Sequence, residues 1–332
     1  MSTRAAPDTP VAPGTTAPAV PETTAAPDAP VAPGTAAAPG ATAAPRGLAV
    51  VVTGASGTLG REAAALLASG HRVRALTRDP ARAAAGGLAG QVMGADFADR
   101  ASLARACEGA DALLVITSNP LRPDHDDNVL AAARAGGVRH VVKVSALAVT
   151  DPDADDLVTR WQRENEERVR ASGMAWTLLR PRAFMSKTRD WAPSIARESV
   201  VRALHGDSRN ACVDPRDVSA VAARVLTEPG HAGRAYALTG PAAVSARDQC
   251  RELAAVVGRP LRFVGMTPRE AVDAWRERYP EPLVQALLEM SARQAAGGKA
   301  DVAHGVAEVL GRPPAAFAAW ARDHAAVFRH AA

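Results

Sequence analysis

Tyrosine, lysine and cysteine are scarce in this chain of 332 residues, and the scarcity of cysteine is the first to exclude a class of protein. Cys107, Cys212 and Cys250 are far apart and odd in number, so we expect neither a disulfide framework nor a paired-cysteine metal site. No run of residues approaches the ~18 apolar positions of a membrane span. The first residues lack the basic-then-apolar order of a secretion signal. We therefore expect a cytoplasmic protein with no membrane partner.

Aromatic residues are also few, at 4% of the chain, and this bears on its slight basicity. The formal net charge is +4, and arginine supplies most of the positive charges because lysine occurs only at positions 143, 187 and 299. Nucleic-acid-binding proteins cluster their basic residues and offer aromatic stacking platforms, whereas here basic and acidic residues are mixed. We interpret the charge as solvated surface and expect no nucleic-acid partner.

Residues 1–46 have a composition of their own, mainly Ala, Pro, Thr, Gly and Val, with no aromatic residue, Leu, Ile or Lys. The decapeptide at 6–15 returns at 26–35 with one substitution. Such a segment has too little apolar surface to offset the entropy of ordering. We predict a disordered tail over 1–46, a first folded domain over 47–180 and a smaller lobe over 181–332, with a segment near 211–240 that returns to the sheet of the first domain.

From residue 47 onward, short β-branched runs alternate with Ala- and Arg-rich helical stretches. Continuously apolar strands that alternate with helices are typical of a parallel sheet covered on both faces, so we predict a doubly wound α/β fold. The second half is less regular and predicts a mostly helical C-terminal lobe. The expected strands are 48–53, 73–77, 91–97, 112–117, 138–146, 175–179 and 234–239. The expected helices include 58–69, 102–108, 128–135, 155–171, 215–226, 245–257 and 268–278.

The strongest local signal follows the first expected strand, where glycines stand at positions 54, 57 and 60 and a helix is expected to begin. In a strand–turn–helix of this kind, Gly54 allows the sharp turn, Gly57 allows the backbone to approach a pyrophosphate, and Gly60 allows close packing of helix on strand. Free N–H groups and the helix dipole then face the anion. The domain over 47–180 is therefore predicted to bind a dinucleotide.

The end of the second expected strand bears on which dinucleotide binds. An acidic residue there would hold the ribose 2′-hydroxyl of NAD, but this chain has Arg78 first, followed by Asp79 and Pro80, which are typical of a turn. An arginine at this place can pair with a 2′-phosphate. We therefore expect NADP(H) in preference to NAD(H); the alternative is an exposed arginine with no ligand.

These motifs resemble the NmrA-like branch of the atypical short-chain dehydrogenase/reductases. The resemblance runs from Thr53-Gly-x-x-Gly-x-x-Gly60 through Val73-Arg-Ala-Leu-Thr-Arg-Asp-Pro80 and Val141-Val-Lys-Val-Ser145 to Gly258-Arg-Pro260, and covers about residues 48–290. Known members include NAD(P)H-dependent quinone, dye and azo reductases, NADPH-sensing regulators and tailoring reductases of secondary metabolism.

The resemblance implies a role for each matching position. The implied cofactor-binding residues are Thr53, Gly54, Gly57, Thr58, Leu59 and Gly60 at the pyrophosphate, Arg78 at the 2′-phosphate, Asp96 and Phe97 at the adenine, Thr117 and Ser118 at the ribose, and Lys143 near the nicotinamide. Ser145 and Lys143 are the implied catalytic residues, and Phe184, Met185 and Trp191 the implied substrate-binding residues. Two alternatives stay open: Ser145 as a local cap, and Lys143 as a strand residue whose charge reaches outward.

One departure from the superfamily concerns its Tyr-x-x-x-Lys proton relay. Neither Tyr236 nor Tyr279 has a lysine four residues later, and alignment on the helix over 155–171 puts Val158 and Gln162 where that pair would stand. Hydride transfer to a quinone or azo group needs mainly positioning, with protons from water.

The aspartates at 124, 126 and 127 open a helix, where acids complement the dipole, so we expect no metal site.

The sequence thus predicts an NADP(H)-dependent oxidoreductase that reduces a quinone-like or aromatic small molecule, in a tailoring step of secondary metabolism. Two other hypotheses are a non-catalytic NADP(H)-sensing regulator and a tailoring enzyme that uses the cofactor without net redox change. Monomer and homodimer stay open.

Overall fold

The computed structural model describes residues 47–329, and the predicted tail over 1–46 lies outside the described residues. The strands are β1 (Ala49–Val52), β2 (Arg72–Thr77), β3 (Gln91–Gly94), β4 (Ala112–Val115), β5 (His140–Val144), β6 (Ala175–Pro181), β7 (Val200–Leu204), β8 (Arg234–Leu238) and β9 (Arg262–Met266). The helices are α1 (Thr58–Ala68), α2 (Pro80–Ala85), α3 (Arg100–Cys107), α4 (Asp124–Ala135), α5 (Leu157–Ala171), α6 (Ala192–Glu198), α7 (Pro215–Thr227), α8 (Ala246–Val257), α9 (Pro268–Arg276), α10 (Glu281–Ala295), α11 (Gly305–Leu310), α12 (Phe317–Asp323) and α13 (Ala325–Arg329), with the 3₁₀ helices η1 (Leu147–Thr150) and η2 (Met185–Trp191).

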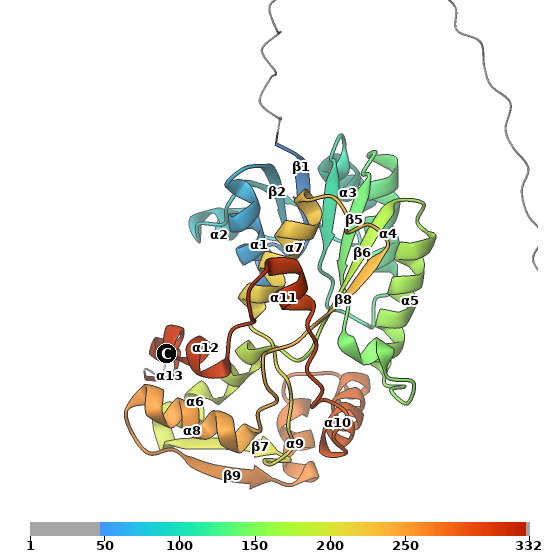
Figure 1. Ribbon diagram of the computed structural model, residues 1–332. Coiled ribbons are helices and arrows are strands. Elements are labelled where there is room, and N and C mark those ends of the chain that lie inside the picture. Colours follow the sequence, from blue (N-terminus) through green and yellow to red (C-terminus); the bar gives the residue numbers. More distant parts are fainter. Residues whose placement is uncertain (1–46, 330–332) are drawn as a thin grey trace, which may run out of the picture. The chain divides into compact units, whose positions relative to one another are not determined.

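Seven of the strands form one parallel sheet in the order β3-β2-β1-β4-β5-β6-β8 (Figure 1). All residues of β1 and β4 are buried, as the continuously apolar runs predict for strands covered on both faces. Strand order reverses between β1 and β4, and the carboxyl ends of all seven strands meet at one edge. The predicted doubly wound fold is confirmed.

Helices cover both faces of this sheet. On one face, α1, α7 and α11 bury apolar residues such as Leu67, Val221 and Val309 against the strands. On the other face, α3, α4 and α5 do the same with Leu103, Val129 and other residues. These two layers hold the sheet rigid, so that side chains at its carboxyl edge are held in fixed positions.

The C-terminal lobe has its own core, in which α6, α8, α12 and α13 enclose Trp320, Phe328 and Ile195 (Figure 1). It is mostly helical, as predicted, but it also contains a parallel pair of strands, β7 and β9, that the sequence pattern did not reveal. Within residues 47–329 no helix is long and apolar enough to cross a membrane.

Local capping follows the sequence closely in this lobe. The Asp214 side chain accepts a hydrogen bond from the backbone N–H of Arg216 at the start of α7, and Thr267 and Glu270 form a capping box at the start of α9, both as expected. One expectation in the first domain was wrong, because Asp79 and Pro80 start the helix α2 rather than a turn. The helical spacing from residue 128 continues back to Asp124, where α4 begins, so the aspartates at 124, 126 and 127 open this helix as expected.

Candidate functional site

The glycine turn between β1 and α1 lies at the carboxyl edge of the sheet, where strand order reverses. Gly54 has φ +57°, a left-handed conformation that favours glycine, and a Cβ atom there would lie 2.9 Å from the carbonyl oxygen of Ile116. At Gly60 a Cβ atom would lie 2.4 Å from the carbonyl oxygen of Gly54. The turn therefore has the shape of a dinucleotide-binding loop: a sharp bend and a helix packed directly on it.

The N-terminus of α1 has no partner from its own turn. Gly57 is the cap residue and provides no side-chain hydrogen bond, and the first turn of α1 contains no acidic residue. Because the first N–H groups of a helix lack internal partners and carry the positive end of the dipole, they favour an anion. These features fit a dinucleotide pyrophosphate.

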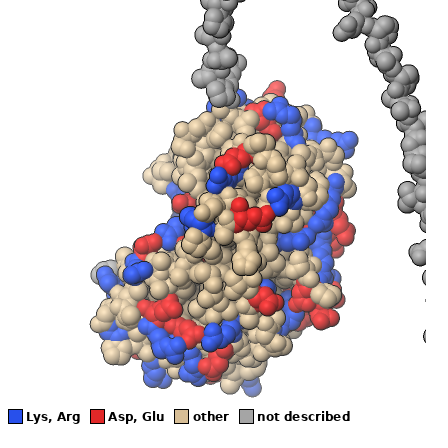
Figure 2. Space-filling model, in the orientation of Figure 1, with Lys and Arg blue, Asp and Glu red and all other residues tan. Residues whose placement is uncertain are grey.

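A cleft of about 480 Å³ opens above this turn, and a second hollow of about 290 Å³ adjoins it. The surface is hollowed at the left of the space-filling view, with basic residues at the rim (Figure 2). Both hollows are lined by Gly57, Thr58, Ser186, Arg189 and Pro215.

Arg189, on η2, is a basic cleft residue that sequence reasoning missed. Its Nε atom is buried without a hydrogen-bond partner, and the side chain borders both hollows beside Gly57. A guanidinium here faces the free N-terminus of α1 across the cleft, where it can pair with a phosphate oxygen. Arginine is so common in this chain that no sequence signal distinguished this one.

Arg78 directly follows β2 and is exposed at the edge where the glycine turn lies. The two segments are joined by a hydrogen bond from the Ala55 N–H to the Leu76 carbonyl oxygen (3.1 Å). Asp79, the acidic residue beside Arg78, caps α2 through the backbone N–H of Arg82 (3.0 Å). The Asp79 carboxylate is thus already hydrogen-bonded within its own helix. Arg78 is then the side chain that can bind a group on the ribose, such as a 2′-phosphate.

Asp96 and Phe97 follow β3, which lies beside β2. The Asp96 carboxylate accepts a hydrogen bond from the Ala98 N–H (2.8 Å), so it shapes the local turn. Phe97 is half-buried, and its ring centroid lies 5.6 Å from that of His125. The structure brings both residues to the same edge as Arg78, where an adenine is expected.

Two threonines expected at the cofactor prove to join strands instead. The Thr53 hydroxyl accepts a hydrogen bond from the Ile116 N–H (2.7 Å) and is fully buried between β1 and β4. The Thr117 hydroxyl donates to Asp126 (2.9 Å) and accepts from Lys143 (2.7 Å), while the neighbouring Ser118 is exposed. The implied contact of Thr117 with a ribose is therefore not supported by its position.

Lys143 is fully buried on β5, so the alternative in which its charge reaches outward was wrong. Its ammonium lies 3.2 Å from Asp126 and 5.4 Å from the centroid of the Trp161 ring. Burial lowers the pKa of Lys143, while the negative charge of Asp126 opposes that shift. Because the Lys143 side chain is fully buried against these partners, the expected direct contact of Lys143 with a nicotinamide is not supported.

Ser145, at the end of β5, donates its hydroxyl hydrogen to Glu166 (2.7 Å), and the alternative of a local cap is not observed. Glu166 is also bound by Arg180 (2.6 Å) and Arg170 (2.8 Å). Burial alone would raise the pKa of Glu166, but hydrogen bonds from Arg180 and Ser145 hold it below its ordinary value. Ser145 is 4% exposed and belongs to this network, which fixes the end of β5.

The expected substrate wall divides into one cleft residue and two packing residues. Phe184 is half-buried and lines the larger hollow. Met185 is 1% exposed inside the core of the C-terminal lobe, so its position does not support the expected contact with substrate. Trp191 packs against the same core. Adjacent residues here point to opposite sides, and the sequence pattern did not show which side is the cleft.

No tyrosine among the described residues takes the place of the missing relay. Tyr236 is buried on β8 and its hydroxyl lies 2.7 Å from His231 Nδ1, while Tyr279 follows α9 in the lobe. Gln162 on α5 is 6% exposed, and its Oε1 atom has no hydrogen-bond partner. The sequence itself has Val158 and Gln162 at the two positions of α5 where the Tyr/Lys pair would stand.

The acidic residues at the start of α4 each have a basic partner. Asp124 pairs with Arg122 (2.7 Å), and Asp127 with Arg168 (3.1 Å). Asp126 is the buried partner of Lys143. Within residues 47–329 no group of three or more His, Cys, Asp and Glu side chains is placed to hold a metal ion.

Comparison with known proteins bears on what this cleft holds. A family profile described as NAD(P)H-binding matches residues 54–229. The chain is 50% identical over 279 residues to the (4-alkanoyl-5-oxo-2,5-dihydrofuran-3-yl)methyl phosphate reductase of Streptomyces griseus, covering 84% of this chain and 99% of the relative. It is 35% identical over 285 residues to the NAD(P)H azoreductase of Xenophilus azovorans, again covering 84% of this chain and 99% of the relative.

A solved structure shares the architecture. The NADPH-dependent quinone oxidoreductase of Escherichia coli, in complex with NADPH, superposes with a TM-score of 0.73 at 27% identity, covering 83% of this chain and 99% of that one. These similarities extend over the sheet, the cleft and the C-terminal lobe together.

Proposed function

Because this chain belongs to the NAD(P)H-binding, NmrA-like branch of the atypical short-chain dehydrogenase/reductases, we propose that it is an NADP(H)-dependent reductase of a conjugated, electron-poor small molecule. Its curated relatives are reductases, and the chain is an NAD(P)H-dependent reductase of the same kind. The observation that carries the proposal is the cleft above the glycine turn, with an uncapped helix N-terminus on one wall and Arg189 on the other.

Cofactor binding is assigned to residues along the edge from β3 to β4. The N–H groups at the start of α1 and the Arg189 guanidinium hold the pyrophosphate, because both offer positive charge to the same hollow. Arg78 holds the 2′-phosphate, which gives the preference for NADP(H). Lys143 and Ser145 act indirectly, by fixing the ends of β4 and β5 from below.

The class of acceptor follows from what the relatives reduce. The Streptomyces griseus relative is named for a lactone phosphate whose ring double bond is conjugated with two carbonyl groups, and the other two for azo and quinone acceptors. All three acceptors delocalise the negative charge that arrives with a hydride. We propose the same class, a quinone-like or α,β-unsaturated carbonyl compound, and a tailoring step in secondary metabolism.

The missing proton relay is consistent with such an acceptor. When bound, the reduced nicotinamide supplies a hydride, which carries two electrons, and a proton from water completes the reduction. A ketone would need an acid of suitable pKa at the developing alkoxide, whereas a delocalised anion is protonated by solvent. The work left to the protein is positioning, which the rigid edge of the sheet provides.

Anaerobic mixing of the purified protein with NADPH and a small panel of acceptors tests this function. The panel comprises a naphthoquinone, an azo dye, the alkanoyl-furanone phosphate and a simple ketone. We expect oxidation of NADPH with the conjugated acceptors and none with the ketone. Binding of NADPH without oxidation by any acceptor would reject the reductase and favour the sensing regulator, and a product of unchanged oxidation state would favour the non-redox enzyme.

A further inference from the structure

Three basic side chains gather at the edge of the sheet on the side away from Arg78. Arg182 directly follows β6, Arg293 lies in the last turn of α10, and Lys299 follows α10 in the chain. The Arg182 side chain is tied to the segment between Arg293 and Lys299: its Nη1 donates to the Gly298 carbonyl oxygen (3.3 Å), and the Gly298 N–H donates to the Arg293 carbonyl oxygen (3.0 Å). The cluster thus joins the end of β6 to the end of α10.

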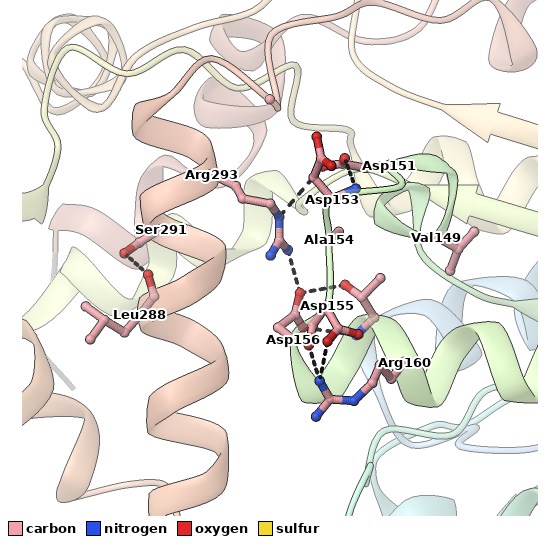
Figure 3. A network of polar contacts seen from close by, with 12 residues as sticks. Val149, Asp151, Asp153, Ala154, Asp155, Asp156, Arg160, Leu288, Ser291 and Arg293 are labelled. Carbon is pink, nitrogen blue, oxygen red and sulfur yellow. Dashed lines mark hydrogen bonds and ion pairs between the residues drawn. The ribbon is translucent and has the colours of Figure 1, made fainter.

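Arg293 is the one member of this cluster whose charge is balanced. Figure 3 shows it reaching from α10 toward the loop before α5, where it pairs with Asp151 (3.7 Å) and Asp156. Asp156 is 1% exposed and caps α5 through the Thr159 N–H (3.0 Å). Arg293 therefore anchors α10 to the sheet and forms one fixed wall of the cluster.

Arg182 and Lys299 lack such partners. Within residues 47–329 neither has a carboxylate within ion-pair distance, and Arg182 Nε is buried without any hydrogen-bond partner. Nearby, the Oδ1 atom of Asn210 is also buried and unpartnered, while its Nδ2 donates to Gln294 at the end of α10 (3.3 Å). The Ala211 N–H donates to the Lys299 carbonyl oxygen (2.9 Å), so the segment with Asn210 is joined to this cluster. Buried polar atoms are nearly always bonded, so unpartnered ones in one region point to a ligand or to water.

The place of the cluster in the sheet distinguishes it from the cofactor site. A dinucleotide held by the glycine turn after β1 and by Arg78 after β2 would have its nicotinamide end toward β4 and β5, on the same side as β6. Arg182 lies three strand spacings from the glycine turn, roughly 14 Å at ~4.8 Å per strand, which is too far to share the pyrophosphate. A substrate that accepts a hydride would have to lie next to that nicotinamide, and therefore near the carboxyl end of β6.

We propose that Arg182 and Lys299 form an anion subsite that binds a phosphate monoester group on the substrate. The proposal rests on the proposed reductase function, and it further specifies that the substrate carries a negatively charged phosphate group. Burial and the charges of Arg293 and Arg182 lower the pKa of Lys299 to about 8, and Asp156 opposes this only in part. Burial also lowers the pKa of Arg182, against the opposing charges of Asp301 and Asp151. A phosphate dianion would balance both side chains, and its monoester linkage would point the acceptor ring back toward β5.

The test compares a phosphate ester with its own alcohol, the alkanoyl-furanone phosphate against the hydroxymethyl furanone. Lys299→Gln and Arg182→Gln should each lower kcat/KM for the ester by at least about tenfold, mainly through KM, and leave the value for the alcohol unchanged. Arg269→Gln, which removes an exposed charge on α9, is the control and should alter neither value. Equal losses for ester and alcohol, or no loss for the ester, would overturn the proposal.

A binding measurement keeps this inference separate from the reductase function. The same ester is titrated by calorimetry into protein saturated with NADP⁺, so that turnover is not needed and the cofactor phosphates are already bound. Weaker binding to both variants than to wild type supports the subsite even if no acceptor is reduced. Equal binding to all three proteins overturns it, as does inorganic phosphate that binds as tightly as the ester, because the site would then serve a free ion.

Discussion

The ammonium of Lys143 lies 3.2 Å from the carboxylate of Asp126, and the two side chains are 0% and 2% exposed. Asp126 also accepts hydrogen bonds from Thr117 (2.9 Å) and Asn165 (3.1 Å), so one carboxylate joins β4, β5 and α5. A buried polar network whose members are all bonded is rigid, so this one holds the strand ends that carry the cleft in one arrangement.

Asp126→Asn should destabilise the protein by about 3–5 kcal/mol, because it leaves the buried Lys143 ammonium without its counter-charge. Urea denaturation measures the loss. Asp124→Asn, which breaks an exposed pair with Arg122 on the same helix, is the matched control and should cost less than about 1 kcal/mol. A loss for Asp126→Asn no larger than for the control would contradict a structural role of the pair.

Gly60→Ala should weaken NADPH binding and destabilise the fold by ~1–3 kcal/mol, since the added Cβ would lie 2.4 Å from the carbonyl oxygen of Gly54. The helix must then move off the turn whose shape holds the pyrophosphate. Fluorescence titration with NADPH and thermal unfolding check both effects. Gly70→Ala is the control, because its Cβ would meet no atom within 4 Å, and it should behave as wild type. If Gly60→Ala has the same NADPH affinity and unfolding temperature as wild type, a glycine is not required at this position.

The sheet and the glycine turn could be predicted from sequence because their signals are local. A run such as Val50–Val52 must be buried on both faces, and Gly54 and Gly60 occupy positions that other residues cannot fit. The pair of strands β7 and β9 could not be predicted, because the two strands are far apart in the chain and each depends on the other for its hydrogen bonds.

The side-chain roles at the edge were harder to predict for the same reason. Whether Lys143 faces the cleft or the interior depends on Asp126, a partner on another element, and on the register of β5 against β4. Met185 and Phe184 are neighbours in sequence, yet one enters the core and the other lines the cleft. Arg189 lines the same hollow as Gly57 only because the fold brings η2 to the start of α1, and the spacing of these residues in the sequence does not show this.

Arg78→Ala should weaken the binding of NADPH more than that of NADH, by ~1–3 kcal/mol, because a charge-assisted contact with the 2′-phosphate is lost. Calorimetric titration of both cofactors gives the difference directly. Arg82→Ala, an exposed arginine on α2 close by, is the control and should change neither affinity. If Arg78→Ala weakens both cofactors equally, the preference for NADP(H) loses its structural basis.

Lys299→Met should stabilise the protein, and the gain should shrink as the pH rises. Burial and the charges of Arg293 and Arg182 lower the folded-state pKa of Lys299 to about 8 from 10.5, and Asp156 opposes this only in part. Between these two values the unfolded chain binds the proton that the folded protein has released, so stability rises with pH there, and below about 8 the penalty of the buried charge is present in full. Removing the amine should therefore add ~1–3 kcal/mol near pH 7, and less than half of that near pH 9.5. Urea denaturation of wild type and variant at both pH values measures this, with the exposed Lys187→Met as the control that should show no gain. If the gain in unfolding free energy is the same at both pH values, the difference between Lys299→Met and wild type comes from packing and not from charge. The cations beside β6 would then not repel one another measurably, and an anion bound there would remove no repulsion.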